Sequence, residues 1–127
     1  MKSERPKIRV GEKKWKQPQI THNQLTKWNW VVNNPQNLQL GRNVDIGAFT
    51  YIQAENGVII HDNVQIGSHV AIYSANTIDG IDGSVEIMEG ACIGSHAVIL
   101  PNVRIGKNAK VRCHSTITRD VEDETTV

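Results

Sequence analysis

The chain has 127 residues with a formal net charge of +1, and 39% of them are hydrophobic and 21% charged. These values favour one globular domain, exclude a disordered chain, and predict no general affinity for nucleic acid. The sequence has no apolar stretch of about twenty residues and no apolar leader, so we expect no membrane span and no secretory signal. Cys92 and Cys113 form no CxxC motif or disulfide framework, so we expect a cytoplasmic protein.

Residues 1–37 contain a basic arm and a segment that we expect to act as a cap. Between Met1 and Gln17 basic side chains outnumber Glu4 and Glu12; they are Lys2, Arg5, Lys7, Arg9, Lys13, Lys14 and Lys16. We interpret the arm as a solvated terminus, with attraction to an anionic cofactor or nucleotide as the alternative. The same segment holds all three tryptophans, and the alternating "KWNWVV" predicts a strand. We expect Trp28 or Trp30 to cover the end of the core.

From residue 38 onward, aliphatic residues recur every six positions. The series restarts twice and reads Leu40, Ile46, Ile52, then Ile60, Ile66, Ile72, Ile78, then Ile87, Ile93, Ile99, Ile105, Val111, Ile117. Small or β-branched residues follow many of these by four, at Val44, Thr50, Val64, Val70, Ala91, Ala97, Val103, Ala109, Ser115 and Val121. A period of six fits neither a helix nor one long strand. It predicts short strands with two inward side chains, separated by turns.

The turns of this repeat are marked by glycine and asparagine. Glycine often follows the aliphatic residue directly, where we expect it to supply dihedrals that a Cβ penalises, and Asn43, Asn63 and Asn108 tolerate left-handed backbone. Three strand–turn units bend the chain around once, so eighteen residues make one coil of a triangular prism. The sequence therefore predicts an all-β parallel β-helix of about four coils over residues 38–127, with stacked isoleucines as its core.

The segment "SANTIDGIDGS", residues 74–84, interrupts the period. Gly80 and Gly83 predict a bent loop at this point. A loop that lines a ligand site and a plain surface excursion both remain open.

Three of the five histidines share one phase of the repeat. His69, His96 and His114 each follow a series residue by three, at an outward corner of the prism. His96 and His114 are eighteen residues apart and therefore share an edge. His69 is twenty-seven from His96, and if the loop replaces one side of the prism it lies on a different edge. An imidazole at such a corner is suited to act as a general base, while simple packing at a subunit boundary is the alternative.

Two stretches resemble a known family. "IGSHAVILPNVRIGKNAKVRCHSTITRDV" (Ile93–Val121) resembles the last coils of the hexapeptide-repeat acyltransferases. "NVDIGAFTYIQAENGVIIHDNVQIGSHVAIYS" (Asn43–Ser74) resembles the branch that acetylates sugars, including nucleotide-linked amino sugars. The resemblance covers about Leu38–Val121. It implies a left-handed β-helix, a homotrimer, acetyl-CoA as co-substrate, a small sugar or nucleotide-sugar acceptor, and no metal, nucleic acid or membrane partner.

The resemblance also suggests site residues. It implies that His69 is the general base, with His96 as the second candidate, because the loop carries no histidine where many family members have theirs. Loops of this kind line the neighbouring subunit's site, where Asp79 and Asp82 would bind a sugar amine or orient an imidazole; both could equally be turn formers. The cofactor contacts that the motifs imply are Ser95, Cys113, Thr118 and Arg119.

Two other functions remain open at the sequence level. A zinc site like that of the γ-carbonic anhydrases also uses corner histidines, although its close "HxxxxH" pair is absent here. A non-catalytic scaffold is favoured by the missing loop histidine and the short stretch after Val121.

Overall fold

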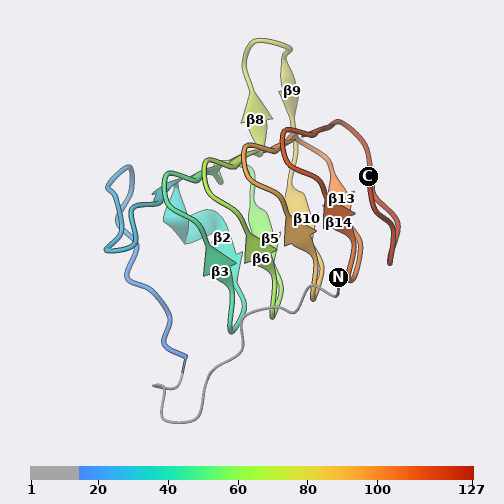
Figure 1. Ribbon diagram of the computed structural model, residues 1–127. Coiled ribbons are helices and arrows are strands. Elements are labelled where there is room, and N and C mark those ends of the chain that lie inside the picture. Colours follow the sequence, from blue (N-terminus) through green and yellow to red (C-terminus); the bar gives the residue numbers. More distant parts are fainter. Residues whose placement is uncertain (1–14) are drawn as a thin grey trace.

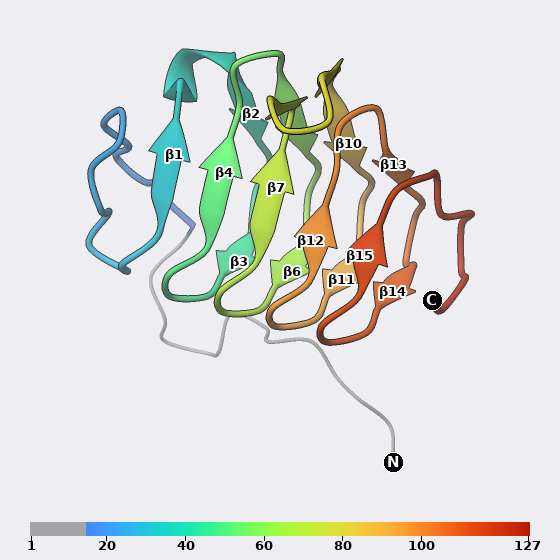
Figure 2. The same ribbon diagram turned by 90° about the horizontal axis from the view of Figure 1, so that it is seen from above.

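The computed structural model describes residues 15–127, so most of the basic arm lies outside the described residues. The described chain winds through three parallel sheets (Figures 1 and 2). The first sheet contains β1 (Val31–Asn33), β4 (Tyr51–Gln53), β7 (Ala71–Tyr73), β12 (Val98–Ile99) and β15 (Thr116–Ile117). The second contains β2 (Leu38–Leu40), β5 (Val58–Ile60), β10 (Val85–Ile87) and β13 (Arg104–Ile105). The third contains β3 (Asp45–Ile46), β6 (Gln65–Ile66), β11 (Cys92–Ile93) and β14 (Lys110–Val111).

Each coil takes one strand from the second sheet, one from the third and one from the first, which gives four full coils and confirms the expected parallel β-helix. Two bridges, Ile105 to Val121 and Lys110 to Thr126, continue the winding beyond β15. The only helix in residues 15–127 is the three-residue 3-10 turn Pro35–Asn37, and none there could cross a bilayer.

The core consists of aliphatic side chains stacked in register from coil to coil. Ile52 pairs with Ile72, and Ile72 with Ile99, along the first sheet, and each of the three is fully buried. The period of six predicts most of this core correctly, with Leu40 and Ser115 only half-buried. Ile78 is the exception: it is 91% exposed, because it lies in the inserted loop and not on a side of the prism.

The first coil is covered at its open end by the preceding segment. Trp30 is buried and belongs to the core, whereas Trp28 is half-exposed, so of the two Trp30 is the one that packs with the core. Strand β1 pairs with β4, so the first sheet already begins at Val31, ahead of the expected boundary at residue 38.

The loop at residues 74–84 forms a hairpin that projects from the prism (Figure 1). Its strands, β8 (Ala75–Asn76) and β9 (Ile81–Asp82), pair antiparallel. Ile60 remains in register with Ile87, and Ile72 with Ile99, on either side of the hairpin. The hairpin is thus added to a complete coil and replaces none of its sides.

Glycine in the repeat serves close packing between coils. Gly67 and Gly94 do not have positive φ, which corrects the expectation that dihedral freedom explains them. A Cβ on Gly67 would lie 2.7 Å from the Ser95 nitrogen, and one on Gly94 would lie 2.5 Å from the Cys113 nitrogen. The recurring "IG" therefore lets neighbouring coils approach at this corner.

Candidate functional site at the histidine edge

The corner between the third and first sheets carries a column of residues with left-handed backbone, which we call the histidine edge. Its members are Asn29 (φ 66°), Phe49 (φ 64°), His69 (φ 56°), His96 (φ 63°) and His114 (φ 63°). Asparagine and histidine are among the residue types that adopt this conformation more readily than most. The backbone N–H groups of the three histidines donate to carbonyls of the preceding coil, those of Ala48, Ser68 and Ser95, each at 3.0 Å.

The side chains of this edge form one continuous stack. The rings of His69 and His96 lie 4.7 Å apart and 5° from parallel, and those of His96 and His114 lie 4.8 Å apart at 10°. Phe49 extends the stack, with its ring 5.3 Å from that of His69 at 43°. All four side chains are exposed. The prediction that His69 occupies a different edge from His96 is therefore wrong, because the hairpin replaces no side of the prism.

A buried threonine fixes the backbone beside the first histidine. The Thr50 hydroxyl donates to the Gly67 carbonyl at 2.9 Å and accepts from the Val70 N–H at 3.3 Å. Because these bonds flank His69 on both sides, they hold its coil against that of Phe49. The edge thus has a rigid backbone beneath exposed side chains.

The predicted cofactor residues divide between two corners of the prism. Ser95 and Cys113 directly precede His96 and His114 and lie beside the histidine edge, where Ser95 is half-buried and Cys113 exposed. Thr118 and Arg119 follow β15, at the opposite end of the first sheet, and both are exposed. The structure does not bring the four together at one point.

The predicted acceptor residues lie on the hairpin. The Asp79 carboxylate accepts from the Asn76 amide at 2.8 Å, which is a contact within the turn. The Asp82 carbonyl accepts from the Asn102 amide at 2.9 Å, which fastens the base of the hairpin to the next coil. His69 precedes β7 and the hairpin follows it, so within one chain the two features lie at opposite ends of that strand (Figure 2).

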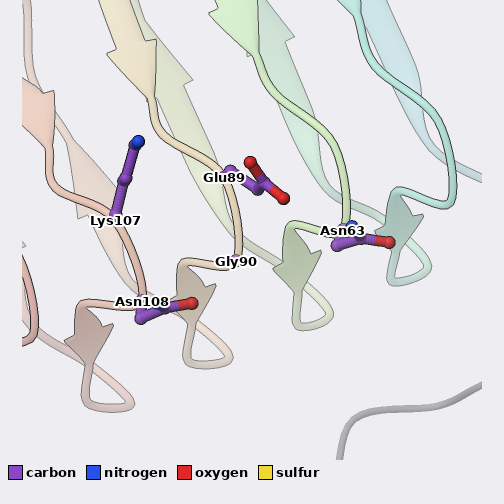
Figure 3. A pocket seen from close by; sticks show the side chains of 5 residues that line it. All are labelled: Asn63, Glu89, Gly90, Lys107 and Asn108. Atoms are coloured by element: carbon purple, nitrogen blue, oxygen red, sulfur yellow. The ribbon is translucent and has the colours of Figure 1, made fainter.

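A shallow hollow occupies another corner, between the second and third sheets (Figure 3). It is lined by the turn residues Asn63, Gly90 and Asn108, with Glu89 and Lys107 at its rim. None of these is a predicted site residue, and none belongs to the histidine edge. Across residues 15–127, no group of three His, Cys, Asp or Glu side chains is placed to hold a metal ion.

Phe49 is a member of the edge that the sequence interpretation missed. It follows Ile46 by three, which is the same phase that places His69, His96 and His114. Applying that phase to every residue type, and not to histidine alone, would have identified it.

Part of the chain is similar to known proteins with a six-residue repeat. Residues 84–119 match the family model of the bacterial transferase hexapeptide (six repeats). A serine acetyltransferase of Bacillus pumilus is 30% identical over 87 residues, which cover 65% of this chain and 40% of the relative. A galactoside O-acetyltransferase of Lactococcus lactis is 28% identical over 98 residues, covering 65% of this chain and 47% of the relative. The chain thus spans less than half the length of these curated relatives.

Solved structures agree on the fold. A hexapeptide-repeat-containing acetyltransferase from Vibrio cholerae superposes with a TM-score of 0.72 at 22% identity, over 77% of this chain and 61% of that one. This likeness confirms the left-handed parallel β-helix. The family match covers β10–β15, the last two coils of this fold.

Proposed function

We propose that the protein is an acetyltransferase that moves the acetyl group of acetyl-CoA to a sugar or a nucleotide-linked sugar. The observation that carries this proposal is the histidine edge, where three exposed imidazoles share a rigid corner. Both curated relatives described above are acetyltransferases, and the one from Lactococcus lactis acts on a galactoside.

The reaction requires a base beside the acceptor. A neutral imidazole of His69 takes the proton of the acceptor hydroxyl or amine while that oxygen or nitrogen attacks the thioester carbonyl. A backbone N–H or a serine hydroxyl stabilises the resulting oxyanion. The carbon–sulfur bond then breaks, and the departing CoA thiolate takes the proton from the imidazolium. The step needs neither a metal nor a covalent enzyme intermediate.

His69 is our first candidate for the base and His96 the second. His69 lies two residues before β7, the strand that leads into the hairpin, whereas His96 is enclosed between two other imidazoles of the stack. Ser95 and Cys113, beside the edge, are the proposed contacts for the pantetheine arm. Thr118 and Arg119 are proposed to bind the more distant parts of the cofactor, where the guanidinium can pair with a phosphate.

We further propose that the active unit is a homotrimer. In a closed ring of three copies, one edge of each prism faces a different edge of the next. The hairpin of one copy then reaches the histidine edge of its neighbour, with Asp79 and Asp82 as acceptor contacts. This arrangement brings together the histidine edge and the hairpin, which one chain holds apart at the two ends of β7.

The test is a thiol-release assay with acetyl-CoA and a panel of pyranosides, nucleotide-linked amino sugars and serine. His69→Asn removes the imidazole but keeps a side chain suited to the left-handed backbone. We expect it to lower kcat at least about 100-fold without lowering the melting temperature, and His96→Asn is the matched comparison. An active His69→Asn variant would remove the base assignment.

Two other outcomes would replace the proposed function. Absence of acetyl transfer, together with no thermal stabilisation by millimolar acetyl-CoA, would favour a non-catalytic scaffold protein. Stoichiometric zinc with carbon dioxide hydration would favour the carbonic anhydrase reading.

A further inference from the structure

Phe49 is the one member of the histidine edge whose residue type does not suit its backbone. Asn29, His69, His96 and His114 belong to types that enter the left-handed region several-fold more often than most. Phe49 has the same conformation, with φ 64°. For a bulky aromatic residue this is a strained conformation, and such strain persists only where the surrounding structure imposes it.

Burial does not compensate for this strain. The Phe49 side chain is 56% exposed, whereas the core of the protein is aliphatic. Its backbone N–H donates to the Asn29 carbonyl at 2.6 Å, and any residue except proline can make that bond. An asparagine here would keep the hydrogen bond, relieve the strain and leave less apolar surface in water. Within one chain, neither the fold nor its stability therefore accounts for the aromatic ring.

The position of the ring indicates a contact role. Phe49 ends the stack at His69, with 5.3 Å between the ring centroids. An exposed aromatic face is thus held at a fixed place beside the proposed base by the same rigid backbone that Thr50 ties down. The electron-rich face of an aromatic ring attracts C–H groups with partial positive charge, and a pyranose presents such groups on its apolar face.

We propose that Phe49 is an acceptor-binding residue that holds the apolar face of a pyranose ring, so that one of its hydroxyl or amino groups reaches His69. The inference rests on the proposed function and names the residue that holds the sugar ring of the acceptor. Serine is a small zwitterion without such a face, and it would gain little from this ring. Phe49 would therefore favour sugars over serine as acceptors.

The experiment measures the steady-state kinetics and melting temperatures of Phe49→Asn and Phe49→Tyr with the best pyranose acceptor of the panel. Phe49→Asn should raise the KM for the acceptor roughly tenfold, leave the KM for acetyl-CoA within about twofold, and not lower the melting temperature. Phe49→Tyr retains an aromatic face and should restore acceptor binding. Saturation-transfer NMR of the ring protons of a methyl pyranoside should show contact with the wild-type protein and lose it in Phe49→Asn.

Several results would overturn the assignment. An unchanged acceptor KM in Phe49→Asn would do so, and a clear fall in its melting temperature would make the ring a structural element. A shifted pH profile of kcat at constant KM would mean that Phe49 positions His69 and does not bind substrate. Transfer to serine with no pyranose accepted would defeat this inference while acetyl transfer itself stands. No transfer to any acceptor would defeat the proposed function.

Discussion

The rings of His69 and His96 stack almost parallel, with centroids 4.7 Å apart, although the whole β8–β9 hairpin lies between them in sequence. That spacing is close to the distance between neighbouring strands of a sheet, so the side chains follow the backbone stacking directly. The geometry of the edge therefore depends on how tightly successive coils are joined at this corner.

Thr50 should control how tightly successive coils pack at this corner. Thr50→Val removes the hydroxyl that bonds to the Gly67 carbonyl and the Val70 N–H, and it leaves both groups without this partner in a buried setting. We expect the free energy of unfolding to fall by about 1–3 kcal/mol in urea titrations. Thr50→Ser keeps the hydroxyl and should lose less; equal losses in the two variants would assign the effect to packing.

Close approach of the coils makes a second position sensitive. Gly67→Ala places a methyl group against the Ser95 backbone and should cost about 3 kcal/mol of unfolding free energy. Gly80, in the hairpin, has φ +67° with open space around it, so Gly80→Ala should cost only about 1 kcal/mol of backbone strain. The reverse order would show that dihedral freedom, and not contact between coils, explains the repeated glycine.

Two isoleucines of the six-residue series should differ greatly in what their truncation costs. Ile72 is fully buried between Ile52 and Ile99, so Ile72→Ala leaves a cavity and should cost about 2–5 kcal/mol. Ile78 is exposed on the hairpin, and Ile78→Ala should change the unfolding free energy by less than about 0.5 kcal/mol. Thermal or chemical denaturation of the dilute protein compares the two directly, and a large loss for Ile78→Ala would contradict the placement of the hairpin.

Tyr51 should make stability fall at alkaline pH. Burial, and to a smaller extent the neighbouring Tyr73, raise the pKa of Tyr51 above its ordinary value of 10.0. The folded state therefore retains the phenolic proton longer than the unfolded state does. The resulting contribution to stability is complete below pH 10 and is lost as the pH rises through the raised pKa.

Urea unfolding of wild type and Tyr51→Phe at pH about 9 and 11 measures this contribution. All other ionisable groups are common to both proteins, so the difference between their two pH dependences of unfolding free energy isolates the phenol. Tyr73→Phe removes only the smaller cause and should flatten the dependence less. Parallel slopes in wild type and Tyr51→Phe would contradict the prediction.

The six-residue period was sufficient to predict the coils, because burial of Ile52, Ile72 and Ile99 requires only that each strand repeat its neighbour. The position of His69 could not be predicted in the same way, because the length of an insertion does not reveal whether it replaces a side or is added to one. The role of Gly67 depends on contact with Ser95 in the next coil, which local dihedral preferences do not describe. Phe49 was missed because only histidines were considered at that corner.

The short length of β7 has a consequence for enzymology. Its three residues span about 10 Å and separate His69 from the base of the hairpin, on different corners of the prism. If acceptor contacts come from the hairpin and the proton is taken at the opposite corner, an isolated copy cannot complete the reaction. Specific activity should then decline on dilution below the dissociation constant of the assembly, and mixing two differently inactivated variants should regenerate working sites.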